Sequence, residues 1–243
     1  MLSAKTVELL ASMTYPSRKA VFDYMAPADL FLLSAQSEEA LDMITSCALE
    51  ATLSINFTHR NTTIDVHTPN GGYSSFLITP YTDENGIQLD VNIDGELIER
   101  CYLTGSELIL HYGLEIVLRR LFNIYRAKRT SLDTLDVTIL GFPGMDVYGL
   151  GELLNGIKNH ATINHLVISN PFGKDYRTEV FGLDKVFEAV KVKEAISMDV
   201  MPLNFPLDQL NLPHLTIYDT LELSEEFITG VLMALPNTEL TID

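Results

Sequence analysis

The feature that most constrains the fold is a change of periodicity in the first half of the chain. From Thr52 to about residue 111, short runs of apolar residues alternate with polar ones, most strictly from Ile87 to Ile93. A period of two places successive side chains on opposite faces of a strand. Pairs such as Asp94-Gly95 between two such runs are typical of hairpins. The sequence therefore predicts an antiparallel β meander of roughly five or six strands, with one buried and one wet face.

The runs of alternating residues and the turn signals between them predict where each strand of the meander lies. We expect strands at Leu53–Phe57, Thr63–His67, Phe76–Ile78, Ile87–Ile93, Leu97–Leu103 and Leu108–Leu110, with turns at Asn70-Gly71-Gly72, Asn85-Gly86 and Asp94-Gly95. Because one face of this sheet is apolar, it must pack against something, most simply the helical segments that flank it in the sequence.

The segment that precedes the meander has the pattern of two short helices. Apolar residues recur at helical spacing from Ala20 to Met25, and Pro27 ends that helix because the residue before a proline is pushed out of the α region. Asp29 can cap a second helix, which begins with the continuous apolar run Leu30–Leu33. Four adjacent bulky residues cannot all face the core of one short helix, so we expect part of this pair to present an apolar surface to a partner.

A longer helix is predicted after the meander, where apolar residues recur every three or four positions from Leu114 to Tyr125. Arg119 and Arg120 belong to the densest basic cluster of the chain, which continues to Arg129. The cluster has two interpretations. It is either a nucleic-acid-binding patch or a solvated helix face whose positive charges interact favourably with nearby carboxylates and with the C-terminal end of the helix dipole.

From Leu132 onward the sequence repeats a short strand pattern at uneven intervals. The pattern is clear at Leu132–Ile139, Ile163–Asn170 and Leu212–Ile217, and weaker at Ile196–Val200 and Leu240–Ile242. Helical segments are expected between these strands, at Tyr148–Ile157, Leu183–Val190 and Ser224–Leu235. Alternating strands and helices that repeat in this way are typical of a βα solenoid with a curved parallel sheet, of the leucine-rich-repeat kind.

Composition excludes several classes of function. Apolar residues make up 47% of the 243 residues, enough for a sizeable core, and the formal net charge is −17. That charge repels phosphate backbones and acidic membranes, so we expect neither nucleic acid nor a membrane as partner. Two distant cysteines, no signal-peptide pattern and no membrane-length apolar run favour a reducing compartment, the cytoplasm or the nucleus.

No pattern in the sequence indicates catalysis or a bound cofactor. The six histidines have no metal-ligand spacing with an acidic neighbour, and His160 and His165 are separated by a predicted boundary between loop and strand. Nucleophile elbows, phosphate loops and dinucleotide fingerprints are also missing. We therefore expect a binding protein, with no catalytic residue, no metal and no cofactor.

The two N-terminal helices resemble an F-box, most of all those of the large nematode F-box families. The pattern is carried by Tyr15-Pro16, the apolar helix Val21–Met25, Ala26-Pro27, Asp29-Leu30 and Leu32-Leu33-Ser34. The resemblance implies that this module binds a Skp-family adaptor and, through it, a cullin. The anchors that it implies are Tyr15, Pro16, Val21, Phe22, Met25, Pro27, Leu30 and Leu33.

The remainder of the chain is similar to the F-box-associated domain that follows nematode F-boxes. The similarity lies in the order of soft motifs: Leu118–Phe122, Glu152–Asn155, Ile163–Ile168, Ala189–Met198 and Leu215–Tyr218. The expected organisation is α+β: an F-box-like helical module at 1–50, the antiparallel β meander at 51–112, and an F-box-associated βα repeat domain at 113–243.

Two functions remain open at this point. The first is the substrate-recognition subunit of a Skp–cullin–F-box ubiquitin ligase, with a target protein held by exposed strand residues of the last domain. Those residues are Asp136, Thr138, His165, Ser169, Asp199, Thr216 and Tyr218. The second is a leucine-rich-repeat-like interaction scaffold or antagonist that no longer binds the adaptor. Tyr15 and Glu38-Glu39 depart from the F-box pattern and favour the second function, whereas Pro16, Pro27 and Leu30 favour the first.

Overall fold

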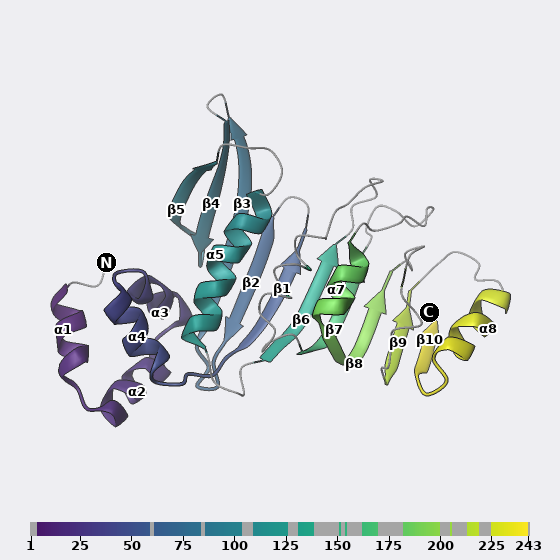
Figure 1. Ribbon diagram of the computed structural model, residues 1–243, viewed down its shortest axis with the longest axis horizontal. Helices are drawn as coiled ribbons and strands as arrows, with labels where there is room; N and C mark the ends of the chain where they lie inside the picture. The colour runs from purple at the N-terminus through teal and green to yellow at the C-terminus, as the bar shows by residue number, and fades with distance from the viewer. Residues whose placement is uncertain are drawn as a thin grey trace. The chain divides into compact units, whose positions relative to one another are not determined.

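The structure is a computed structural model, shown as a ribbon in Figure 1. It describes residues 4–58, 61–83, 86–103, 109–125, 131–138, 151, 154, 162–169, 182–199, 205, 213–218 and 225–242. The fold is α+β, with N-terminal helices, then antiparallel strands, then parallel strands with helices between them. The chain forms two compact units, residues 1–53 with 63–131 and residues 54–62 with 132–243.

The first unit begins with four short helices, α1 (Ala4–Ser12), α2 (Tyr15–Tyr24), α3 (Pro27–Ser34) and α4 (Glu38–Thr45). Proline occupies the first turn of both α2 and α3, where a missing N–H costs nothing. Ala26, which precedes Pro27, is extended (φ −62°, ψ 145°) and separates the two helices, as the sequence predicts.

The antiparallel strands are β1 (Thr52–Phe57), β2 (Thr62–His67), β3 (Tyr73–Asp83), β4 (Gly86–Ile93) and β5 (Glu96–Leu103). In the first unit the strand order is β2-β3-β4-β5. The predicted hairpin at Asp94-Gly95 is confirmed, because both residues have positive φ (51° and 87°) and β4 pairs antiparallel with β5 around them. The predicted turn at Asn85 lies outside the described residues.

One predicted strand is wrong. The run Leu108–Leu110 was expected to close the meander, but α5 (Ile109–Ile124) begins at Ile109. The apolar spacing that continues through Leu121 suits a helix, and the three-residue run is too short to distinguish a strand from a first helical turn. The predicted helix in this region is confirmed and is longer than expected.

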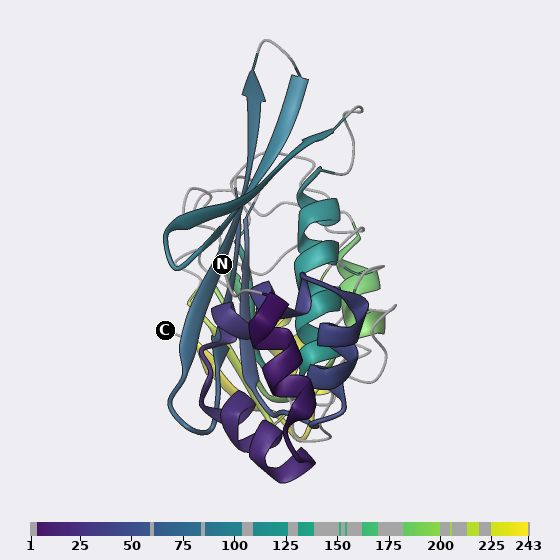
Figure 2. The same ribbon diagram turned by 90° about the vertical axis from the view of Figure 1, so that its left-hand side faces the viewer.

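The core of the first unit lies between the helices and the sheet. Helix α5 packs on β3 and β4 and also contacts α3 and α4 (Figure 2). Phe31 of α3 meets Phe76 of β3 edge to face, with ring centroids 5.1 Å apart. The N-terminal helices therefore share one core with the antiparallel strands.

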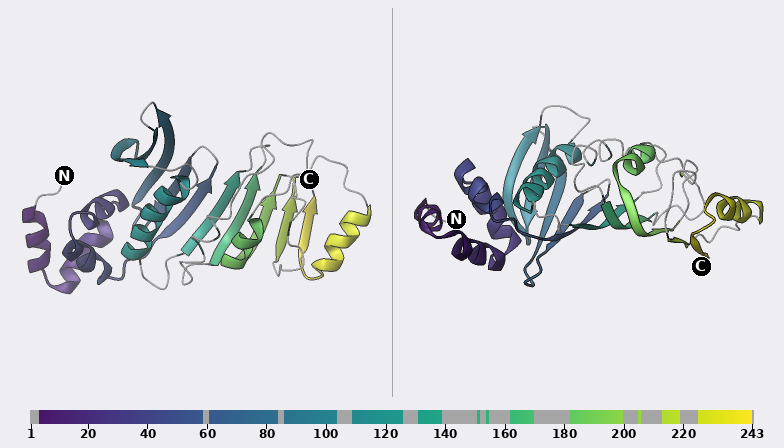
Figure 3. Two further views of the ribbon diagram at one scale, coloured as in Figure 1. Left: turned by 45° about the horizontal axis from the view of Figure 1, so that its top comes forward. Right: turned by 60° about the horizontal axis from the view of Figure 1, so that its bottom comes forward.

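The second unit contains the parallel strands β6 (Ser131–Thr138), β7 (Thr162–Ser169), β8 (Lys191–Met198), β9 (His214–Ile217) and β10 (Glu239–Ile242). Each pairs in parallel with the next along the chain. Helix α7 (Leu183–Ala189) covers one face of these strands, and α8 (Glu225–Ala234) lies between β9 and β10 in sequence (Figure 3).

The prediction for this region is confirmed only in part. The parallel strands and the helices near 183–190 and 224–235 are present, but the described residues show no solenoid. Most of the predicted helix at Tyr148–Ile157 and the loops after β6 and β7 lie outside the described residues. The repeating leucine-rich-repeat architecture therefore remains a prediction.

Candidate functional site

Helix α2 has two faces of different character. Its inner face carries Phe22, which is 1% exposed, and this side chain packs into the core of the first unit. Its outer face carries Ala20, Val21 and Tyr24, and Val21 and Tyr24 are 38% and 81% exposed. These three residues lie at spacings of one, three and four, so they share one side of the helix. We call Ala20, Val21 and Tyr24 the outer face of α2.

Several of the predicted adaptor anchors are not on the surface. Leu30 and Leu33 are 1% and 0% exposed, and Pro27 and Phe22 are buried as well. The expectation that these four side chains are uncovered is therefore wrong. Helix α3 has eight residues and lies against α4, α5 and β3. Most of its apolar side chains are therefore buried within the unit.

The remaining predicted anchors are accessible. Tyr15 and Val21 are exposed, Pro16 is exposed, and Met25 is half-buried. All of them lie on α2 or at its C-terminal end. The structure thus divides the predicted anchors into an accessible set on α2 and a buried set centred on α3.

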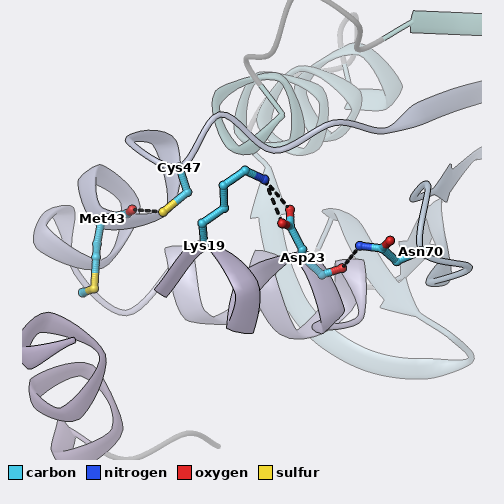
Figure 4. Close-up of polar contacts among 5 residues, drawn as sticks. All are labelled: Lys19, Asp23, Met43, Cys47 and Asn70. Carbon is cyan, nitrogen blue, oxygen red and sulfur yellow. Dashed lines mark hydrogen bonds and ion pairs between the residues drawn. The ribbon is translucent and has the colours of Figure 1, made fainter. Parts of the chain in front are cut away.

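Hydrogen bonds fix α2 and α3 relative to the antiparallel sheet of the same unit. The Asn70 side-chain amide donates to the Asp23 carbonyl oxygen at 3.0 Å, and the Ala28 backbone N–H donates to Ser74 Oγ at 3.0 Å. Lys19 Nζ lies 2.7 and 2.8 Å from the two carboxylate oxygens of Asp23, one helical turn further on (Figure 4). The bonds from Asn70 and to Ser74 join the two helices to the region of β2 and β3, whereas the Lys19–Asp23 pair lies within α2.

Glu38 and Glu39, which depart from the F-box pattern, have a structural role. They occupy the first turn of α4, and the preceding Ser37 accepts a hydrogen bond from the Ala40 backbone N–H at 3.1 Å. A serine cap followed by acidic residues stabilises a helix N-terminus through its unpaired N–H groups and the dipole. This segment is therefore explained by local helix stability.

Several of the predicted target-binding residues lie at matching register positions in the parallel sheet. Strand register places Asp136, Val167, Ser197 and Thr216 in one row across β6 to β9. Thr138 pairs with Ser169 in the next row. The alternate residues Leu166, Ile196 and Leu215 are buried, whereas Thr216 and Tyr218 are accessible. The period of two thus places Thr216 on the side of β9 opposite the buried Leu215 and Ile217.

Two histidines on this sheet each face a glutamate on a neighbouring strand. His165 Nε2 lies 3.3 Å from a carboxylate oxygen of Glu194, and His214 Nδ1 lies 3.0 Å from one of Glu239. Residues His165, Ala195, His214 and Glu239 are in register from β7 to β10. Of the predicted target-binding residues, His165 is therefore engaged by Glu194 within the sheet. Asp199 also has an interaction partner.

Comparison with known proteins identifies no relative. No protein-family model, no curated protein and no solved structure matches the chain.

The described residues also contain no group of three histidine, cysteine, aspartate or glutamate side chains placed to hold a metal ion. Within the same residues, no helix is long and apolar enough to cross a membrane.

Sequence reasoning missed two features of the site. Tyr24 is absent from the predicted anchors, although its position three residues after Val21 and four after Ala20 indicates the same helical face. The second is a cavity beside α2 that is partly open to solvent. It is lined by residues from α2, α3, the Leu49-Glu50 segment after α4, the Thr68–Asn70 turn and Tyr125 after α5. No sequence pattern could indicate it, because its lining comes from five separate segments.

Proposed function

We propose that the chain is the substrate-recognition subunit of a Skp–cullin–F-box ubiquitin ligase. The observation that supports this proposal most is the exposed outer face of α2, in a helical segment whose proline and leucine pattern resembles an F-box. An exposed Tyr and Val on one side of a rigidly held helix are the kind of aromatic and aliphatic groups that anchor a protein interface.

The docking residues in this proposal are the accessible part of the predicted set together with Tyr24. Tyr15, Pro16, Val21 and Tyr24 contact the adaptor, and Met25 lies at the margin. Phe22, Pro27, Leu30 and Leu33 support this surface from beneath, since they form the core against which α2 and α3 pack. A stable contact of this kind buries on the order of 1,200–2,000 Å² in total, so parts of the adaptor must also reach beyond α2.

Target recognition is assigned to the polar face of the parallel sheet. Thr216 and Tyr218 are accessible there, and Asp136, Thr138 and Ser169 occupy matching register positions. In this role the chain itself performs no chemistry. It holds a target protein close to the ubiquitin-transfer subunits, and proximity is its contribution to the rate.

The test is co-purification of the full chain with a Skp-family adaptor. Because Leu30 is buried, Leu30→Glu would unfold the protein and say nothing about docking. Tyr24→Glu and Val21→Glu change exposed side chains instead, and we expect each to reduce adaptor binding by about tenfold or more. Leu232→Glu is the matched control, because Leu232 is an exposed leucine on α8.

The results separate docking from loss of fold. Circular dichroism should show all three variants folded, and Leu232→Glu should bind as the wild type does. Undiminished co-purification of Tyr24→Glu and Val21→Glu would show that the outer face of α2 is not the docking surface.

A second function is favoured by a specific observation. The burial of Phe22, Leu30 and Leu33 removes the most apolar predicted anchors from the surface, which suits an interaction scaffold or antagonist that no longer binds the adaptor. In that case the wild-type chain fails to retain any Skp-family adaptor while it retains a different protein partner through the polar sheet face.

A further inference from the structure

The antiparallel sheet of the first unit has one side on which large side chains are exposed. Phe76 of β3 is buried on the other side, where it meets helix α3 and where α5 also packs (Figure 2). Tyr73 and Leu77 are an odd number of positions from Phe76, so their side chains lie on the opposite face of the strand. Tyr73 is 51% exposed. Leu97 is 48% exposed and belongs to the same face, because the register runs from Leu77 through Asn92 to Leu97.

Two aromatic rings on this face lie next to one another. The ring centroids of His67 on β2 and Tyr73 on β3 are 4.8 Å apart, and the rings are tilted by 41°. The Tyr73 hydroxyl donates a hydrogen bond to Asp65 Oδ1 at 3.0 Å, which holds the tyrosine ring although half of it is exposed. A side chain that is already held loses little conformational entropy when a partner binds to it. The two rings therefore form a preformed surface for binding.

The same face carries negative charge that the chain does not neutralise. Asp65 and Asp94 take part in no ion pair within the part of the chain that the structure describes. Strands β2, β3 and β4 contain no lysine and no arginine. A hydrogen bond with Ser75 lowers the pKa of Tyr73, but the hydrogen bond to Asp65 and the charges of Asp65 and Asp94 outweigh it and raise the pKa. Both carboxylates thus act on the exposed tyrosine.

From these features we propose that this side of the sheet binds an arginine-containing segment of a partner protein. A guanidinium group is planar, stacks on aromatic rings and pairs with carboxylates. It lies on the Tyr73 ring between the charges of Asp65 and Asp94, and Leu97 contacts the aliphatic part of the segment. The net charge of −17 attracts a basic partner from a distance. We call this surface the aromatic–acidic sheet face; its residues are Asp65, His67, Tyr73, Leu77, Asp94 and Leu97.

This inference goes beyond the proposed function and does not depend on it. Adaptor docking is assigned to the outer face of α2, and target recognition to the parallel strands. The aromatic–acidic sheet face uses neither of these elements.

The experiment measures binding of the full chain to a fluorescent peptide with three arginines separated by serines, by fluorescence anisotropy. The buffer contains about 0.15 M NaCl, which screens the general charge of the protein. We expect a dissociation constant on the order of 0.1 mM. A lysine peptide of equal charge should bind about threefold more weakly, because an ammonium group does not stack as a guanidinium does. A citrulline peptide, which has a similar shape but no charge, should show no saturable binding.

Three variants test the assigned contacts. Asp65→Asn and Asp94→Asn keep a hydrogen-bond acceptor at each position and remove one negative charge, so each should weaken the arginine peptide by about fivefold. Tyr73→Ala removes the ring and should weaken it by a similar factor of about five. The matched control is Glu39→Gln, which removes the same charge from the exposed start of α4 and should bind like the wild type. Circular dichroism checks that each variant is folded.

Three outcomes would overturn the proposal. They are equal binding of the citrulline and arginine peptides, an equal loss of affinity in Glu39→Gln and Asp65→Asn, and undiminished binding by Tyr73→Ala. Amide chemical shifts of the wild-type chain locate the arginine peptide independently of any variant. Changes centred on β2 and β3 support the proposal, and changes confined to other elements contradict it. The docking variants of α2 should bind the peptide normally, so this proposal and the proposed function fail separately.

Discussion

At the scale of single residues, burial decides what each apolar side chain does. Leu30 and Leu33 have the same chemistry as Leu9 or Leu232, but the first two lie in the core and the last two face outward. Tyr125 is buried although it carries a polar group: its ring belongs to the core, while its hydroxyl has no hydrogen-bond partner in the described structure. Such a group stabilises the fold through its apolar area and destabilises it through its polar atom.

Tyr125 makes the stability of the protein depend on pH in alkaline solution. Burial raises its pKa above the ordinary value of 10.0, so the folded state keeps the proton when the unfolded state loses it. Its contribution is complete below pH 10 and declines as pH rises above that, by about 1.4 kcal/mol per pH unit. The contribution falls because in that range the unfolded state binds fewer protons than the folded state.

The measurement is urea unfolding of wild type and Tyr125→Phe between pH 8 and about 11. Phenylalanine cannot ionise, so we expect the stability of Tyr125→Phe relative to wild type to increase with pH above 10. At neutral pH the variant should already be about 1 kcal/mol more stable, because it no longer buries an unpaired hydroxyl. A pH-independent difference between the two proteins would contradict this account.

At the scale of elements, local sequence signals determine where the helices begin and packing determines which faces they bury. Pro16 and Pro27 lie in the first turns of α2 and α3, and Ser37 caps α4. The apolar run of α3 has almost no periodicity, and it is buried because α4, α5 and β3 surround it. Helix α2 lacks such neighbours on its outer face, which leaves Val21 and Tyr24 exposed.

The cap of α4 is a direct test of the local signals. Ser37→Ala removes the hydrogen bond that the Ala40 N–H donates, and we expect the free energy of unfolding to fall by about 1 kcal/mol. Ser37→Asp keeps an acceptor at the same position and should retain the wild-type stability. Chemical denaturation measures both variants, and an equal loss in Ser37→Asp would mean that the hydroxyl acts through something other than the cap.

At the scale of the whole molecule, charge is the dominant property. The chain carries 33 acidic and 16 basic residues, for a formal net charge of −17. Ion pairs such as Lys185 with Glu188 neutralise only single acidic groups, so the folded protein repels itself electrostatically. This excess of negative charge also opposes binding to nucleic acid, although Arg119 and Arg120 belong to a local basic cluster.

Salt should therefore stabilise the protein. Raising NaCl from about 0.05 M to about 0.5 M shortens the Debye length from well over 10 Å to about 4 Å and screens the repulsion. We expect the midpoint of thermal unfolding to rise by several degrees, as measured by calorimetry, with sucrose as a neutral control. A fall in the midpoint with added NaCl would mean that favourable ion pairs outweigh the general repulsion.

The sequence by itself determined the class and order of most elements. Alternation at Ile87–Ile93, the Asp94-Gly95 pair and the helical spacing from Leu114 to Tyr125 depend on neighbours in sequence, and each led to the correct element. The side-chain period of two also let the sequence predict that Thr216 alternates with the buried Leu215 and Ile217, whereas the register between strands came only from the structure. The strand predicted at Leu108–Leu110 failed because a short apolar run is compatible with both periods.

Only the tertiary structure decided which apolar residues are covered and where the cavity lies. Leu30 and Val21 are both aliphatic residues of short helices that start with proline in the first turn, yet one is in the core and the other is on the surface. The cavity joins Lys19, Glu50, Asn70 and Tyr125, which are far apart along the chain. Burial and cavities depend on contacts between distant segments, whereas periodicity, caps and turns depend on neighbours, and a single sequence displays only the neighbours.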